Sequence, residues 1–234
     1  MKRFLECCCT SPFEAVQAQE GGASRVELCE DLPSGGVMPR KEVLEETLKA
    51  VSIPVNVLVR PRRGGFVYTE DEILETLGLI RMCKEMRVAA PDGSTRRVNG
   101  VVVGTLDGSL RVDKASIGRM VALARAGDHP LSVTFHRAFD ECLDPLEALE
   151  DIIALGCDTL LTAGHAASVN EGKEMLRTLV RKAAGRIAVL AGSGVRPSNI
   201  AGLEKYTGVT LFHSSAHGPD GRTCSAVVSE MAGR

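Results

Sequence analysis

Cysteines are the first candidates for chemistry in this chain. There are eight, and the consecutive run Cys7-Cys8-Cys9 is followed at some distance by Cys29. Thiolates select soft ions such as Cu(I) and zinc. If segments 3–9 and 24–29 are adjacent strands, Cys8 and Cys29 share one face with Cβ atoms about 5 Å apart. The pair could then bind one soft ion. The alternative is that all eight cysteines are small buried apolar side chains.

Two carboxylates accompany these cysteines on the same predicted face. Glu6 and Glu27 each precede one of the two thiols by two positions, so we expect them to oppose each other deeper in the fold. Neighbouring carboxylates repel, so one must be protonated or a cation must lie between them. Arg60 and Arg62 are the expected partners. The glutamates are therefore either an acid/base pair or part of a structural ion-pair network.

Two histidines end predicted strands. His136 is followed by Asp140 after a short loop, and this carboxylate could tune the imidazole as a general acid or base. The alternative is a hydrogen-bonded structural histidine. His213 ends the last predicted strand, whereas the other histidines occupy predicted loops: His129, His165 and His217.

A glycine turn, Gly192-Ser193-Gly194, lies between a predicted strand and a predicted helix. Exposed backbone N–H groups before a helix favour an anion, and barrels often bind phosphate after strands seven and eight. The alternative is a tight turn that requires glycine. The predicted anion-binding set is Arg60, Arg62, Gly192, Gly194 and His213.

Short apolar strands alternate with amphipathic helices along the chain. The predicted strands are 3–9, 24–29, 54–60, 98–104, 131–136, 158–162, 186–191 and 209–214. The predicted helices are 12–20, 39–50, 70–87, 113–126, 144–155, 168–184 and 197–204, with a weaker helix at 223–231. Strict alternation predicts a parallel sheet, and eight units in this length favour one (β/α)₈ TIM barrel over residues 1–234. A doubly wound open sheet is the main alternative.

Alternation within the strands predicts which side chains face the barrel interior. Polar or thiol residues share one face in several strands, for example Glu6 and Cys8, whereas Leu5, Cys7 and Cys9 share the other. A purely structural parallel strand would be apolar on both faces. The sequence therefore predicts a ligand-binding interior near the carboxyl ends of the strands.

Composition excludes several classes of protein. The chain has 234 residues with 28 basic and 30 acidic side chains, which gives a net charge of -2. It therefore lacks the excess of basic residues that is typical of proteins that bind nucleic acid or anionic membranes. No apolar stretch is long enough for a membrane span, and no signal-peptide core follows the N-terminus. We therefore expect a cytoplasmic protein with reduced thiols. Residues 89–97 are polar and predict an exposed loop insertion.

The order of these segments resembles the copper homeostasis protein CutC family. The most specific matches are Arg25-Val26-Glu27-Leu28-Cys29 and Val133-Thr134-Phe135-His136-Arg137-Ala138-Phe139-Asp140, and the resemblance covers residues 5 to about 216. It implies a TIM barrel, a role in copper handling and Cu(I) ligands at Cys8 and Cys29, without an organic cofactor. The family loop Arg-Pro-Arg-Gly-Gly-Asp-Phe differs here at Arg63 and Gly65. The short tail after Ala216 predicts a reduced final helix and a homo-oligomer, with a dimer as the simplest case.

Three functions remain open at this point. The first is Cu(I) binding by the two thiolates. The second is an enzyme acting on a small anionic or phosphorylated metabolite, with Glu6, Glu27, His136 and Asp140 as the acid/base groups. The third is an assembly protein without an active pocket. The sequence does not decide whether the protein is an enzyme.

Overall fold

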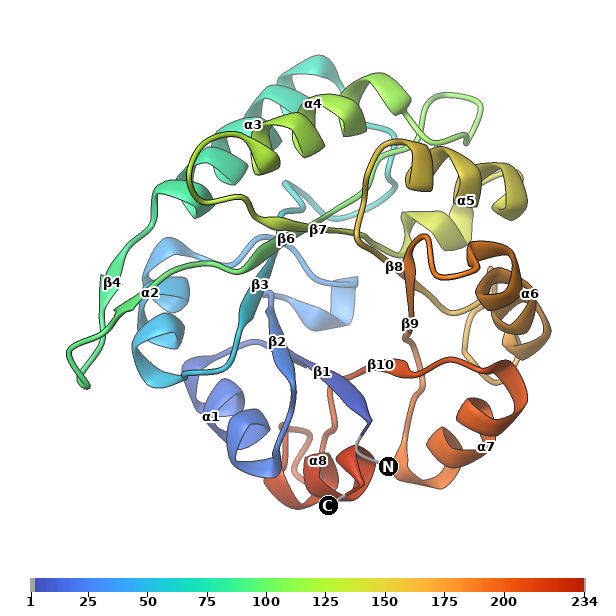
Figure 1. Ribbon diagram of the computed structural model, residues 1–234. Coiled ribbons are helices and arrows are strands. Elements are labelled where there is room, and N and C mark those ends of the chain that lie inside the picture. Colours follow the sequence, from blue (N-terminus) through green and yellow to red (C-terminus); the bar gives the residue numbers. More distant parts are fainter. Residues whose placement is uncertain (1–2, 234) are drawn as a thin grey trace.

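Parallel strands close on themselves at the centre of the molecule (Figure 1). In this computed structural model, which describes residues 3–233, the strand order around the barrel is β1-β2-β3-β6-β7-β8-β9-β10, and β10 pairs with β1. The bounds are β1 (Phe4–Cys9), β2 (Arg25–Leu28), β3 (Val55–Leu58), β6 (Gly100–Val103), β7 (Ser132–Phe135), β8 (Thr159–Thr162), β9 (Ala188–Ala191) and β10 (Leu211–Ser214). The closed barrel confirms the predicted fold and excludes the open sheet.

Helices surround this barrel on the outside (Figure 1). They are α1 (Pro12–Gly21), α2 (Lys41–Ala50), α3 (Glu70–Glu85), α4 (Lys114–Arg125), α5 (Pro145–Ala154), α6 (Lys173–Ala183), α7 (Pro197–Thr207) and α8 (Ser225–Ala232). Helix α8 has only 8 residues, which agrees with the predicted reduction of the final helix. None of the helices in the described range is both long and apolar enough to cross a membrane.

Capping residues explain where several helices begin. Thr69 and Glu72 form a reciprocal capping box at the start of α3, in which each side chain satisfies a backbone N–H of the other. Asp144 accepts from two backbone N–H groups at the start of α5, and Pro145 occupies the first helical position. These local signals are why the helix starts could be predicted closely.

Three local elements differ from the prediction. The segment 89–97 is largely a two-stranded antiparallel hairpin, β4 (Val88–Ala89) with β5 (Thr95–Arg96), rather than an irregular loop. Figure 1 shows this hairpin extending away from the barrel beside α2. Two short 3-10 helices, η1 (Leu32–Ser34) and η2 (Arg137–Glu141), occupy loops that follow β2 and β7. Both lie at the end of the barrel that carries the candidate site.

Two separate apolar regions reflect the alternation of the strands. Cys7, Cys9 and Val57 belong to the large core between the barrel and its helices. Cys8 and Cys29 belong instead to a small cluster inside the barrel, which also contains Leu58 and Val102. The predicted division of the cysteine triplet between the two faces is therefore confirmed.

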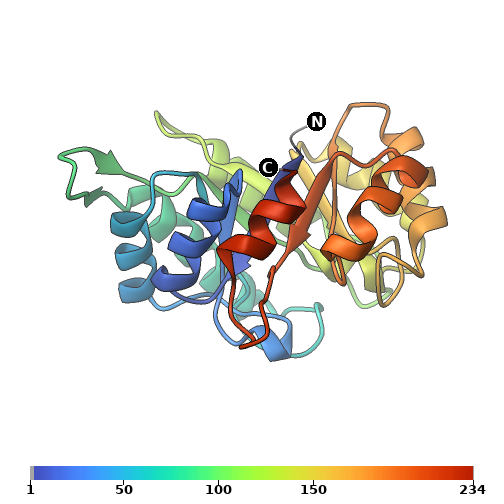
Figure 2. The ribbon, with the colours of Figure 1, turned by 90° about the horizontal axis from the view of Figure 1, so that it is seen from below.

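The first and last elements complete the barrel. Strand β1 pairs with β10, and Figure 2 shows α8 beside β1 and β10. Helices α1 and α8 pack closely at Gly21. A Cβ atom at this position would lie only 2.5 Å from the carbonyl oxygen of Ser225, so the contact requires glycine. The N-terminal strand, which carries the candidate thiol Cys8, is thus held on both sides by β2 and β10.

Candidate metal and ligand site

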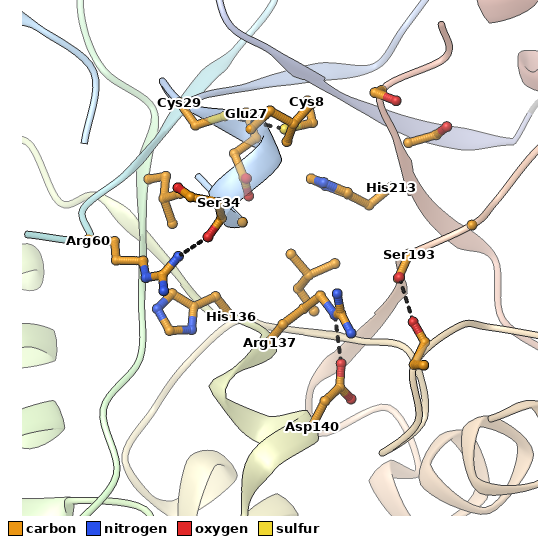
Figure 3. A pocket seen from close by; sticks show the side chains of 18 of the residues that line it. Cys8, Glu27, Cys29, Ser34, Arg60, His136, Arg137, Asp140, Ser193 and His213 are labelled. Atoms are coloured by element: carbon orange, nitrogen blue, oxygen red, sulfur yellow. Dashed lines mark hydrogen bonds and ion pairs between the residues drawn. The ribbon is translucent and has the colours of Figure 1, made fainter. Parts of the chain in front are cut away.

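A cavity of about 800 Å³ opens at the carboxyl ends of the barrel strands. Its walls come from the ends of most strands and from the loops with η1 and η2, as Figure 3 shows for the labelled side chains. This is the end at which TIM barrels bind ligands. Of the predicted site residues, those lining the cavity are Cys8, Glu27, Cys29, Arg60, His136, Asp140, Gly194 and His213.

The thiols of Cys8 and Cys29 meet at one side of this cavity. Their Sγ atoms lie 3.5 Å apart, and both residues are buried. The loop after β2 turns closely over Cys29 at Gly36, whose φ of +84° and contact with Leu58 leave no room for a side chain. The hydrogen bond with Cys29, followed by burial, raises the pKa of the Cys8 thiol well above its ordinary value. The thiol of Cys8 is therefore protonated when no ion is bound.

An imidazole and a carboxyl group lie beside Cys8. The ligand atoms of Cys8, Glu27 and His213 are all within 4.8 Å of one another, a spacing at which one metal ion can contact all three. The sequence had suggested an anion-binding role for His213, whereas the structure brings it to the thiol of Cys8. Gly192 has a supporting place here, because a Cβ atom on it would lie 3.3 Å from Cβ of His213 and 2.6 Å from Leu161. Gly192 itself does not line the cavity.

Glu6 orients this imidazole from beneath the cavity. The Nδ1–H of His213 donates to Oε1 of Glu6 at 2.8 Å, and Arg25 forms an ion pair with the other carboxylate oxygen. Although burial raises it, the pKa of Glu6 is lowered overall by the hydrogen bond from His213 and the charge of Arg25. The bond at Nδ1 leaves Nε2 of His213 available as a ligand atom.

The prediction that Glu6 and Glu27 oppose each other was wrong. In the observed register Glu6 lies beside Arg25, and Cys8 lies beside Glu27. The strands of a closed barrel are staggered, so the register cannot be obtained by counting back from the two thiols. Arg25 is consequently a member of the site that the sequence analysis missed, although alternation with Glu27 and Cys29 would have placed it on the inward face.

Glu27 is a buried carboxyl group without a strong partner. Its Oε2 atom makes no hydrogen bond within the described residues 3–233. Burial raises the pKa of Glu27 to about 7, and the charge of Glu6 adds to this increase. The carboxyl group can therefore exchange a proton or accept a cation near neutral pH.

The two arginines of the predicted anion clamp have different positions. Arg60 is buried and donates to the carbonyl oxygens of Gly36 at 2.9 Å and Ser34 at 3.2 Å, which fixes the loop containing η1. Arg62 does not line the cavity, because it forms an ion pair with Glu72 of α3. The expectation that these arginines pair with Glu6 and Glu27 was therefore wrong. Glu6 pairs with Arg25 and His213 instead.

His136 and Asp140 do not form the predicted acid/base pair. Burial, followed by the charge of Arg60, lowers the pKa of His136 to about 3, so its imidazole is neutral. Its Nδ1 atom accepts from the N–H of Ala138 at 3.1 Å. Asp140 instead accepts from the N–H groups of Ala163 and His165 after β8, and it pairs with Arg137. Asp140 orders a loop and does not tune His136.

The fold and the site together define a (β/α)₈-barrel protein with soft and borderline ligand atoms at its mouth. The sequence pattern of the CutC family matches residues 3–218. A family protein CutC from Parabacteroides distasonis is 43% identical over 218 residues, which cover 92% of this chain and 84% of the relative. Another, from Chromobacterium violaceum, is 41% identical over 218 residues, covering 93% and 83%.

A solved structure agrees with these sequence relatives. A crystal structure described as a copper homeostasis protein CutC from Streptococcus agalactiae matches with a TM-score of 0.79 and 27% identity, covering 94% of this chain and 99% of that one. The chain belongs to the CutC family. The resemblance predicted from its sequence motifs is confirmed.

Proposed function

We propose that the protein binds one Cu(I) ion between the thiolates of Cys8 and Cys29. The observation that carries the proposal is the 3.5 Å separation of their Sγ atoms at one side of an open cavity. Thiolate sulfur is a soft ligand that selects soft ions such as Cu(I). The description of the Streptococcus agalactiae relative as a copper homeostasis protein supports copper as the cargo.

The surroundings of the thiols suit a bound cation. His213 offers Nε2 as a third ligand, because Glu6 already accepts from Nδ1 and fixes the ring. A carboxylate behind a ligating histidine raises the basicity of the ligand nitrogen and orients the ring. Glu27 contributes a negative charge nearby when it is ionised, which would stabilise the ion–protein complex.

A titration with copper tests this proposal. Reduced protein is titrated with Cu(I) under anaerobic conditions against a chromophoric chelator, and Zn(II) is titrated in parallel. We expect one equivalent of Cu(I) to be withdrawn from the chelator with a clear preference over zinc. Cu(I) that remains entirely with the chelator would contradict the proposal, and a preference for zinc would reassign the site to a different ion.

The thiol chemistry also bears on the cellular location. All eight cysteines are free, and the two candidate ligands are useful for Cu(I) only while they are reduced. We therefore propose that the protein acts in the cytoplasm, where thiols remain reduced.

Gel filtration with light scattering would test the predicted homodimer.

A further inference from the structure

The cavity is much larger than one metal ion requires. A volume of about 800 Å³ lies within the range of small-molecule sites, which is roughly 300–1,000 Å³. The thiols and Glu27 lie together at one side, whereas His136 and Ser193 lie further along the walls (Figure 3). The remaining space can accommodate an organic ligand beside the candidate ion site.

His136 lines this space and carries a hydrogen-bond donor without a partner among the described residues. Because Nδ1 accepts from the N–H of Ala138, the imidazole proton lies on Nε2. Nε2 has no partner within the described residues 3–233, and the residue is only 4% exposed. The ring is held against Phe66, with ring centroids 5.0 Å apart, and against Gly104, where a Cβ atom would lie 2.4 Å from Nδ1. A buried donor of this kind requires an acceptor, which a ligand oxygen would provide.

A second group of donors lies at the turn between β9 and α7. Within residues 3–233 the backbone N–H groups of Ser193 and Gly194 make no hydrogen bond, and both residues line the cavity. Both have positive φ values, 80° and 83°, in the turn that precedes the N-terminus of α7. Arg196 also lines this side of the cavity. Backbone donors and a cation near a helix start favour an anion of the size of phosphate.

The charges around the cavity agree with an anionic ligand. Arg60, Arg137 and Arg196 all line it. Three carboxyl groups line it: Asp140 is already bound by Arg137 and by backbone N–H groups, Glu141 is exposed at the rim, and Glu27 lies with the thiols on the other side. The unused groups on the two walls are therefore donors, and they come from the ends of two different strands, β7 and β9.

We propose that this cavity binds a small phosphorylated organic compound, with its phosphate at the Ser193–Gly194 turn and a second oxygen on Nε2–H of His136. The two contacts require a bifunctional ligand such as a sugar phosphate. This site goes beyond the thiol pair, because neither donor group belongs to the candidate copper ligands.

The test uses ribose 5-phosphate and inorganic phosphate as probes of the reduced, metal-free protein. Calorimetry measures binding, and long-range ¹H–¹⁵N spectra of histidine-labelled protein follow Nε2 of His136. We expect ribose 5-phosphate to bind more tightly than inorganic phosphate and to shift the His136 resonance. Absence of binding by ribose 5-phosphate at millimolar concentration would overturn the proposal.

Matched variants locate the two contacts. Gly194→Asp places a carboxylate at the turn and is expected to weaken both probes at least about tenfold by like-charge repulsion. Gly185→Asp is the control, because Gly185 has a similar φ of +77° and open surroundings away from the cavity. His136→Phe should weaken ribose 5-phosphate but leave inorganic phosphate unchanged. Equal binding by Gly194→Asp and the parent protein would refute the phosphate position.

The copper proposal and this inference can fail separately. Cys29→Ser is expected to retain the binding of ribose 5-phosphate, because its thiol belongs to neither donor group. The two sites would not be independent if the folded Cys29→Ser variant lost the binding of both Cu(I) and ribose 5-phosphate. A folded protein is verified in each case by its thermal unfolding transition.

Discussion

Replacing Cys29 by Ser is expected to weaken Cu(I) binding by more than about 100-fold. Loss of a residue that only hydrogen-bonds to a metal ligand already weakens metal binding by about 10–100-fold, and Cys29 is proposed to contact the metal itself. Cys8→Ser should have the same effect, because the proposed Cu(I) site uses both sulfur atoms. A hydroxyl group is a hard donor that a soft ion does not prefer. Competition against a chelator of known affinity, performed without oxygen, measures the change.

A third cysteine provides the control for this prediction. Cys224 is free, lies away from the cavity and occupies the N-cap position of α8. Serine is a favourable residue at a helix N-cap, so Cys224→Ser should fold normally and bind Cu(I) like the parent protein. If Cys29→Ser and Cys224→Ser bind Cu(I) equally well, the thiol pair is not the copper site.

Replacing Glu27 by Gln is expected to stabilise the metal-free protein by about 3 kcal/mol at pH 8. In the folded protein the pKa of Glu27 is raised from its ordinary value of 4.5 to about 7 by burial and by the charge of Glu6. The folded state therefore binds more protons than the unfolded state between these values, so the free energy of unfolding falls as pH rises from about 4.5 to 7. Glutamine carries no charge and lacks this decrease.

Chemical denaturation at several pH values measures the effect. The Glu27→Gln variant and the parent protein should have similar free energies of unfolding at pH 4.5 and should diverge up to about pH 7. Glu6→Gln is the matched comparison with the opposite sign, because the pKa of Glu6 is lowered by His213 and Arg25. In the parent protein, ionised Glu6 stabilises the folded state at pH values above its ordinary pKa, and this stabilisation is lost as pH falls. The Glu6→Gln variant lacks it. Parallel pH profiles for parent and Glu27→Gln would contradict the assigned environment of Glu27.

The barrel and the inward face of its strands were accessible from the sequence. The period of two within each strand is a local property, so the separation of Cys8 from Cys7 and Cys9 follows from the chain alone. Proline and capping residues likewise fix helix starts such as those at Pro12 and Pro145. These features depend on neighbours in the sequence and on the general rules of parallel sheets.

The partners of the charged groups were not accessible in this way. The stagger between β1 and β2 determines that Glu6 meets Arg25, and it arises from closure of the whole barrel. The neutral state of His136 depends on burial and on Arg60, which follows β3 and is distant in the chain. The approach of His213 to Cys8 joins residues from opposite ends of the chain. Long-range register and burial, which no local pattern contains, decide these contacts.

X-ray absorption spectroscopy of the protein loaded with one equivalent of Cu(I) is the most direct test of the proposed site. We predict a first coordination shell with two sulfur atoms from Cys8 and Cys29 and one nitrogen atom from His213. Cys8→Ser should lose one of these sulfur atoms, whereas Cys224→Ser should give the parent spectrum. A shell that contains only nitrogen and oxygen atoms, or two sulfur atoms that persist in the Cys8→Ser/Cys29→Ser double variant, would contradict the assignment.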